Sequence, residues 1–388
     1  MKLKSHKSLL VLLALIMTLS FTLGACGGSS DDEGSAGTSA DALKIGWIYI
    51  GTVNDGGYTQ AQNAGKIAVE DAFGDRVETA YLEEIDDTNT QESKEAAIQL
   101  IDQGCKVIIG TSFGFGAALT ELANSGDYDD VIFLHFSDPE AQNDTNLADY
   151  FGAMEEPRYL SGIIAGMQTE SNKLGYVAAF PYTEVQIGID AFTLGAQSVN
   201  PDVEVNVVYI NSWYDPSQEK AAAEALLAQG CDVITQHADT TSPQQAAADA
   251  GKLTIGYNLD NSKLEGLEDA FLTAPIWNHG AYLVPTVQSI LDGTWTAVGK
   301  VSPFGYYGTI SDGFVDLAPL TDNVSDEAKA KVEEVKALME SGEFKVFTGP
   351  ILDSDNNEVV KDGEVLTPEQ IWQINYEVKG VKASGSGN

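Results

Sequence analysis

Short apolar runs alternate with longer amphipathic stretches along the first part of the chain. The apolar runs predict strands at 43–50, 77–82, 106–110 and 131–136, and the amphipathic stretches between them predict helices at about 58–73, 91–103 and 116–125. Strands that alternate with helices of this length favour right-handed βαβ units on a parallel sheet. The sequence therefore predicts an α/β fold.

The same pattern begins again after 150–157. It predicts helices at about 158–170, 187–199 and 243–250, and strands at 174–180 and 253–257. Residues 77–113 and 205–239 share one order of parts, and Gln-Gly-Cys closes the helix of each, at 103–105 and 229–231. A repeated unit of this length indicates two similar lobes.

The remaining sequence is less regular. Helices are expected at about 279–292 and 325–341, and 345–378 resembles a β-hairpin followed by a C-terminal strand.

The N-terminus has the pattern of a secretory signal peptide over residues 1–25. Three lysines precede an apolar run from Leu9 to Leu23, which ends in Leu-Gly-Ala before Cys26. This junction resembles the bacterial lipobox, in which the cysteine is acylated; an ordinary secretory signal is the alternative. Residues 26–42, rich in Gly and Ser, would then form a flexible tether behind a lipid anchor.

The formal net charge is −37, from 58 acidic and 21 basic residues. Nucleic acid and anionic membrane surfaces repel such a body, so neither is an expected partner. Cys105 and Cys231 occupy equivalent places in the two repeats, so we expect two small buried side chains in different lobes and no disulfide. They have no metal-ligand spacing, and we predict neither metal nor cofactor.

No nucleophile, zinc or phosphate-loop motif is present, and the four histidines are scattered. Polar and aromatic residues instead gather where strands end, which is where open parallel sheets bind ligands. These residues are Asn54, Asp55, Tyr58, Ser112, Phe113, Ser137, Asp138, Trp213, His237, Asp239, Asn258 and Asp260. The set suits a small, flat, hydrogen-bonding ligand, although singly Trp213 could be core, Asp260 a helix cap and His237 a satisfied strand-end side chain.

Several stretches carry a family resemblance. They are NDGGYTQAQNAGKIAVE (54–70), RYLSGIIAGM (158–167), LGYVAAFP through AFTLGAQSVNP (174–201), INSWYDPSQEKAAAEALLAQGCDVITQHAD (210–239), GYNLD (256–260) and FTGPILD (347–353). From Lys44 to about Gly349 the chain resembles the basic membrane lipoprotein family, the PnrA-like solute-binding lipoproteins of ABC transporters.

The resemblance implies a type I periplasmic-binding fold, with two Rossmann-like parallel-sheet lobes joined by a hinge of three crossovers. We expect lobe I to contain 43–152 and about 277–310, lobe II to contain 153–276 and about 311–382, and residues 383–388 to form a disordered tail. The well-known members bind purine nucleosides and stack the base between two aromatic rings. By position these rings fall on Tyr58 and Trp213.

The family's base-reading Asn and Asp fall near Asn54, Asp55 and Asp138, and its ribose-gripping carboxylate falls on Asp260. Nucleoside binders place a lysine beyond that carboxylate, whereas this chain has TAPIWNH at 273–279, which includes Trp277 and Asn278. Trp277 and His237 look like the subgroup that takes free bases such as adenine. Bulk at Trp277 would occupy room that ribose needs.

The resemblance implies a monomeric, extracytoplasmic lipoprotein without catalytic activity, lipid-anchored to the bacterial cell membrane. It would capture a purine base or nucleoside and pass it to an ABC permease and its ATPase. One alternative is a sensor that presents the same clamp to a receptor, and another is an extracellular purine hydrolase.

Overall fold

The computed structural model describes residues 42–384. The predicted signal peptide, Cys26, the tether up to residue 41 and residues 385–388 lie outside the described residues.

The first sheet is parallel throughout and has the strand order β11-β5-β4-β3-β1-β2. Its strands are β1 (Leu43–Ile48), β2 (Val77–Leu82), β3 (Val107–Gly110), β4 (Ile132–Phe136), β5 (Leu147–Gly152) and β11 (Tyr306–Gly308). Its helices are α1 (Tyr58–Phe73), α2 (Thr90–Asp102), α3 (Gly116–Ala123) and α8 (Gly280–Leu291). The helices pack in two pairs, α1 with α8 and α2 with α3.

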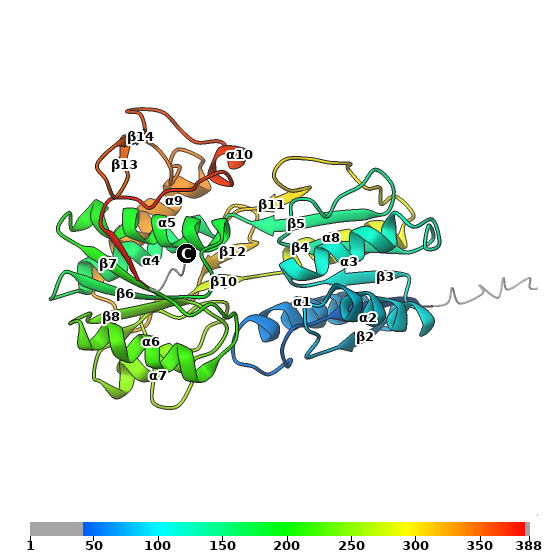
Figure 1. Ribbon diagram of the computed structural model, residues 1–388, viewed down its shortest axis with the longest axis horizontal. Helices are drawn as coiled ribbons and strands as arrows, with labels where there is room; N and C mark the ends of the chain where they lie inside the picture. The colour runs from blue at the N-terminus through cyan, green and yellow to red at the C-terminus, as the bar shows by residue number, and fades with distance from the viewer. Residues whose placement is uncertain (1–41, 385–388) are drawn as a thin grey trace, which may run out of the picture. The chain divides into compact units, whose positions relative to one another are not determined.

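The second sheet is also parallel and has the order β15-β7-β6-β8-β9. Its strands are β6 (Lys173–Ala178), β7 (Glu204–Tyr209), β8 (Val233–His237), β9 (Leu253–Thr254) and β15 (Val381–Ser384). Its helices are α4 (Glu155–Gln168), α5 (Thr183–Val199), α6 (Pro216–Ala228) and α7 (Ser242–Asp249). Figure 1 shows α4 and α5 on one face of this sheet and α6 and α7 on the other.

The chain passes between the two sheets three times. It leaves the first sheet after β5, returns to it through α8 and β11, and goes back to the second sheet for β15. The antiparallel pair β10 (Pro275–Trp277) and β12 (Val315–Leu317) lies on two of these passages. Two all-parallel sheets linked in this way form the predicted type I periplasmic-binding fold; the exact lobe boundaries stay a prediction.

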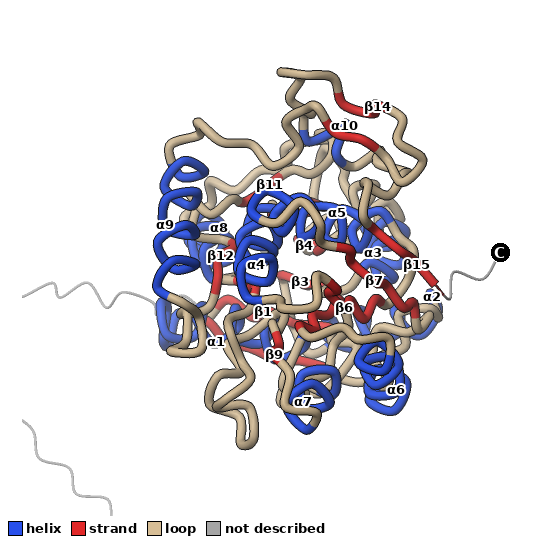
Figure 2. The backbone as a smooth tube through the Cα atoms, turned by 90° about the vertical axis from the view of Figure 1, so that its left-hand side faces the viewer, coloured by secondary structure: helices blue, strands red, loops and turns tan. Residues whose placement is uncertain are grey.

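The remaining elements follow the third passage. Helix α9 (Asp326–Glu340) packs beside α4, as Figure 2 also shows. Strands β13 (Ile351–Leu352) and β14 (Glu358–Val360) form the predicted hairpin, and the short helix α10 (Pro368–Ile371) follows. Serine or threonine caps begin both helices, at Ser325 and Thr367.

Helices α4 and α5 approach so closely that their contact requires glycine. A Cβ atom at Gly162 of α4 would lie 2.1 Å from the Phe192 carbonyl oxygen, and one at Gly195 of α5 would lie 2.0 Å from that of Tyr159. Small residues at these positions let the two backbones touch. The pair therefore forms a rigid layer on the second sheet, next to the first passage.

Most predicted helices and strands are present, with several differences. Strands β5, β10 and β12 and the short helix α10 were not predicted, and the strand expected at 253–257 contains only Leu253–Thr254. The C-terminal strand follows the hairpin later than expected, so Ala383 and Ser384, which we assigned to the tail, belong to β15 and pair in parallel with β7.

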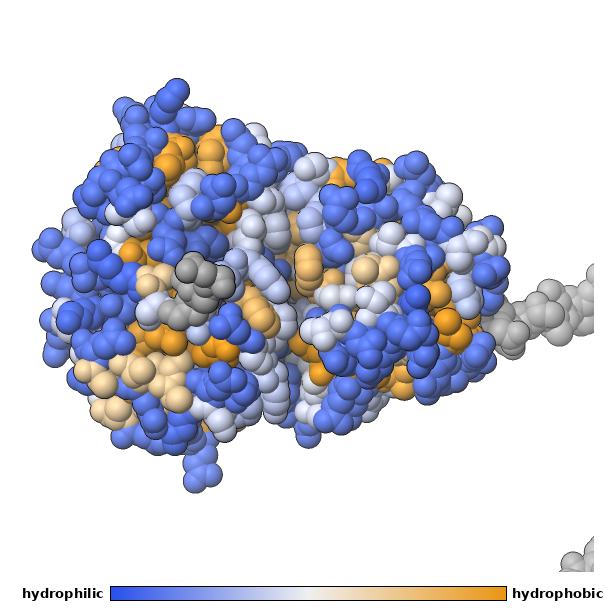
Figure 3. Space-filling model, in the orientation of Figure 1, coloured by the Kyte–Doolittle hydropathy of each residue, from blue (hydrophilic) through white to orange (hydrophobic). Residues whose placement is uncertain are grey.

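The two cysteines of the described chain are free and buried, as predicted. Within residues 42–384, no helix is long and apolar enough to cross a membrane. Polar residues dominate the face drawn in Figure 3, with apolar residues in scattered patches.

Candidate functional site

A cavity lies where strands of both sheets end. The space between its lining atoms is about 400 Å³, part of it open to solvent. Seven of the lining residues are Tyr, Phe or Trp, which gives the cavity flat apolar walls. The lining consists of Ile50, Tyr58, Ser112, Phe113, Phe136, Ser137, Phe151, Glu184, Trp213, His237, Asp239, Tyr257 and Trp277.

Tyr58 begins α1 and is fixed by its hydroxyl. The hydroxyl donates to the Thr111 carbonyl oxygen at the end of β3, and it accepts from Gln62 Nε2 at 3.3 Å. The helix start itself is held by Asp55, whose carboxylate accepts from the backbone N–H groups of Gly57, Thr59 and Gln60 at 2.8–3.0 Å. The Tyr58 ring is therefore fixed both at its hydroxyl and at the helix start that carries it, and it presents a rigid face to the cavity.

Trp213 lies in the loop between β7 and α6. Asp215 caps α6 by accepting from the Gln218 N–H at 2.9 Å, and Pro216 takes the first helical position, so the loop has a defined end. The Trp213 carbonyl oxygen accepts from the Asp239 N–H at 3.0 Å, and its ring packs 5.2 Å from that of Phe180. The second sheet thus supplies a second aromatic wall.

Trp277 is buried in strand β10 and also lines the cavity. Its indole Nε1 donates to Asn258 Oδ1 at 3.0 Å, and its ring meets those of Phe136 and Phe151 at 5.2 and 5.3 Å. The side chain therefore has one defined position. Trp277 thus belongs to a chain segment that connects the two sheets, and its ring forms part of the cavity wall.

Two carboxyl groups, those of Glu184 and Asp239, face a cavity whose described lining contains no Lys or Arg. Burial raises the pKa of Glu184 to about 7. Burial also raises the pKa of Asp239, and the nearby carboxylates of Glu219 and Asp55 raise it further. Such a wall favours neutral or cationic ligands over anions.

His237 stays neutral because burial, followed by the nearby Arg158 charge, lowers its pKa well below the usual range. Its Nε2 lies 3.4 Å from the Tyr257 hydroxyl. The buried Arg158 guanidinium stacks 3.8 Å from the centre of the Tyr257 ring. Tyr257 itself lines the cavity, so Arg158 supports the cavity wall.

The two sheets' loops touch beside the cavity. Asn261 Nδ2 donates to the Gly56 carbonyl oxygen at 3.2 Å, and the rings of Phe113 and Tyr182 lie 6.3 Å apart. A Cβ atom on Gly57 would lie 1.8 Å from the Asp239 carbonyl oxygen. Only glycine at position 57 permits this approach.

The structure brings eight of the predicted strand-end and binding residues together and leaves six outside the lining. The eight are Tyr58, Ser112, Phe113, Ser137, Trp213, His237, Asp239 and Trp277. Asn258 lies outside it and accepts from Trp277 Nε1. Of the others, Asn54, Asp260 and Asn278 are exposed, and Asp55 is occupied as a helix cap. Asp260 accepts from the Ser262 N–H, and Asn278 donates to the Gly313 carbonyl oxygen. Their roles in binding stay predictions.

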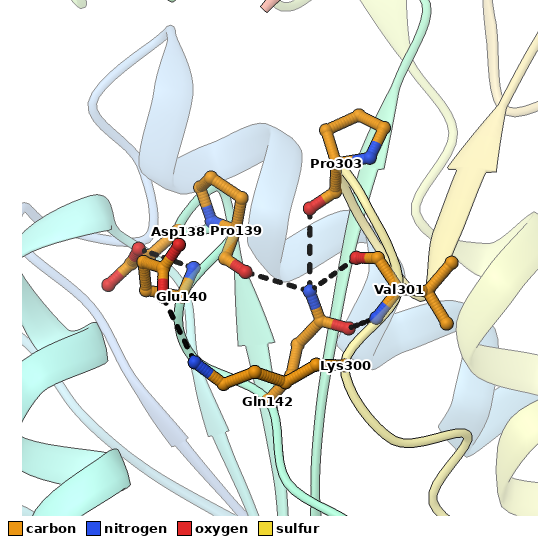
Figure 4. A network of polar contacts seen from close by, with 7 residues as sticks. All are labelled: Asp138, Pro139, Glu140, Gln142, Lys300, Val301 and Pro303. Carbon is orange, nitrogen blue, oxygen red and sulfur yellow. Dashed lines mark hydrogen bonds and ion pairs between the residues drawn. The ribbon is translucent and has the colours of Figure 1, made fainter. Parts of the chain in front are cut away.

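Asp138 is another residue outside the lining, and it packs against Gly116. Its carboxylate accepts from the Glu140 N–H at 3.0 Å and fills the place where a Gly116 side chain would be. Figure 4 shows the adjoining network, in which Gln142 Nε2 donates to the carbonyl oxygens of Pro139 and Val301. This network ties the loop after β4 to the segment before β11.

Five residues of the wall were not among the predicted strand-end and binding residues. They are Ile50, Phe136, Phe151, Glu184 and Tyr257. Phe136 and Tyr257 directly precede predicted strand-end residues, so their position along the strands was an available signal. Glu184 begins α5 after the strand β6, which also fits the rule that ligands lie beyond strand ends.

Among residues 42–384, no group of three or more His, Cys, Asp or Glu is arranged to hold a metal ion.

Two parallel-sheet halves around an aromatic cavity are the architecture of a solute-binding protein. The chain belongs to the PnrA-like family of ABC transporter substrate-binding proteins, whose model matches residues 42–346.

Three known proteins illustrate the similarity. The chain is 36% identical to a purine-binding protein of Brucella abortus, over 90% of this chain and 95% of that protein. It is 33% identical, over 84% of its length and 79% of the other's, to a protein of Haloferax volcanii whose name assigns it to an ABC transporter as a glucose-binding component. A solved ABC transporter solute-binding protein from Aeropyrum pernix superposes with a TM-score of 0.65 at 17% identity, covering 78% of this chain and 92% of that one.

Proposed function

We propose that this solute-binding protein captures a purine, with a free base such as adenine favoured over a nucleoside. The observation that carries the proposal is the placement of Tyr58 and Trp213, from different sheets, on one small cavity with aromatic walls. A flat heteroaromatic ring gains most from such walls, because it can stack on both sides at once. Polar groups at the cavity edge would then read the ring's hydrogen-bonding pattern.

In this proposal the protein is a monomer held outside the cell membrane by a lipid on Cys26. It delivers its ligand to an ABC permease and its ATPase without any covalent step. The sensing alternative, in which the bound form signals to a receptor, stays a prediction.

The Haloferax relative makes a sugar the second candidate ligand. Aromatic rings also stack on sugars, but each sugar hydroxyl needs hydrogen-bonding partners once it is buried. Several polar groups of the lining are already bonded within the protein: Ser112 to Asp87, Tyr58 to Thr111 and Gln62, and Tyr257 to His237. The groups left are those of Ser137, Glu184, Asp239 and one ring nitrogen of His237. This shortage favours a purine.

A thermal-shift screen of bases, nucleosides and sugars tests the proposed function. We expect adenine to raise the melting temperature, since a ligand at about 100 times its Kd stabilises the folded state by about 2.7 kcal/mol. Stabilisation by glucose and not by purines would make the purine proposal wrong. Chromatography of the same samples should recover nucleosides intact; release of free base would support the hydrolase alternative instead.

The preference for a free base is tested at Trp277. Trp277→Phe removes part of the bulk that borders the cavity and makes room for a ribose. The ratio of the adenosine Kd to the adenine Kd should therefore fall by about tenfold. Calorimetry with both ligands measures this ratio. The lost bond to Asn258 will lower stability, so the melting temperature of the variant is recorded alongside. An unchanged ratio in a folded variant would show that Trp277 does not exclude the sugar.

A further inference from the structure

Glu184 is a cavity carboxyl that neither the sequence prediction nor the family assignment accounts for. It lies in the first turn of α5, is half-buried and lines the cavity, and no protein group among the described residues donates a hydrogen bond to it. A helix N-terminus favours the charged carboxylate. Burial outweighs that effect here, since the pKa of Glu184 is raised to about 7.

The groups that face Glu184 give it no counter-charge. The side chains electrostatically coupled to it are Tyr58 of α1, Asp239 after β8 and Tyr257 after β9. None of them is a cation. The nearest buried cation, Arg158, acts on Tyr257 and His237. Two carboxyl groups in one cavity without a lysine or arginine in its lining do not both ionise readily.

We propose that Glu184 binds the purine as a neutral carboxylic acid, its hydroxyl donating to a ring nitrogen and its carbonyl oxygen accepting from the adjacent N–H. This inference rests on the proposed function and adds the recognising group to it. A neutral acid carries one donor and one acceptor on neighbouring atoms, which match the ring-nitrogen and amino edge of an aminopurine. Charged purines such as urate, and nucleotides, are excluded because the cavity wall is acidic.

Because the carboxyl group must be protonated to bind, adenine affinity should fall as the pH rises. If only the protonated form of Glu184 binds, affinity is highest below the pKa of about 7 and falls by about tenfold per pH unit above it. Calorimetry with adenine, from about pH 5.5 to about pH 8.5, measures this slope in a range where adenine itself stays neutral.

Two substitutions at this position separate the bond from the charge. Glu184→Gln keeps one donor and one acceptor but cannot titrate, so it should bind adenine at every pH in this range without the slope. Glu184→Ala removes both groups and leaves a buried donor and acceptor of the ligand unpaired, so it should weaken binding by about 10- to 100-fold. A slope that persists in Glu184→Gln, or unchanged affinity in Glu184→Ala, would overturn the inference.

Asp239→Asn is the matched control, because Asp239 is the other carboxyl of the cavity. The pH slope should persist in this variant; its loss there, with its persistence in Glu184→Gln, would assign the proton to Asp239 and contradict the inference. Adenine binding by the wild type without any pH slope also removes the inference but leaves the proposed function in place. If no purine binds the wild type at any pH, the proposed function fails, and this inference fails with it.

Discussion

Trp213→Ala is expected to weaken adenine binding by about 10- to 100-fold, because stacking a base on one aromatic ring contributes about 1–3 kcal/mol. The tryptophan lies in a loop and is partly buried, and the α6 cap at Asp215 does not depend on its side chain. The fold should therefore survive the change. Calorimetric titration with adenine, together with the melting temperature of the ligand-free protein, measures both effects.

The matched control is Tyr214→Ala, in the next position of the same loop. The Tyr214 side chain is 53% exposed and does not line the cavity. The Tyr214→Ala variant should therefore bind adenine with the affinity of the wild type. If Tyr214→Ala weakened binding as much as Trp213→Ala, loop distortion and not stacking would explain the loss.

Gly57→Ala should be the second damaging change, and it acts without touching the aromatic walls. The backbone at Gly57 has φ −147° and ψ −122°, outside the β and α regions that alanine favours, so the melting temperature of the ligand-free variant is measured alongside its affinity. The added methyl group would lie 1.8 Å from the Asp239 carbonyl oxygen of the other sheet's loop. The two loops must then separate, which opens the cavity beside Asp239.

We expect this separation to cost about 1–3 kcal/mol, as overpacking does elsewhere, and to reduce adenine affinity by about 10- to 100-fold. Small-angle scattering with saturating adenine should show a larger radius of gyration for the variant than for the wild type. Asn261→Ala removes one hydrogen bond from the same contact and should cost only a few-fold in affinity. Wild-type affinity in Gly57→Ala would mean that ligand binding does not need this contact.

The elements that periodicity predicted well are those that bury one face. Helix α1 and strand β2 begin and end where the pattern places them, since their apolar positions alternate with polar ones at a helical or strand period. Strand β5 was missed because all six of its residues are buried, Asp149 included, so no alternation marks it. Strand β9 is shorter than its apolar run because the chain turns away at Gly256 to meet the passage at Ile276.

The candidate site divides in a similar way. Tyr58 and Trp213 could be named in advance, because each follows a predicted strand and matches a family position. Asp55 could not be separated from them, since one carboxylate serves equally as a helix cap or a ligand group until its partners are seen. Phe136 and Tyr257 sit inside predicted strands, where burial in the core was the simpler interpretation.

The sequence by itself determined two repeated βα halves, the family and the aromatic residues that end their strands, since these depend on local periodicity and on motifs. Which residues form one cavity was decided only by the tertiary structure. Glu184 and Asp239 follow the paired strands β6 and β8 of the second sheet, whereas Trp277 lies on a passage between the sheets. Strand pairing and the passages together bring these distant segments to one cavity. The protonation of Glu184 also depends on this assembly, because its pKa responds to burial, which no local pattern encodes.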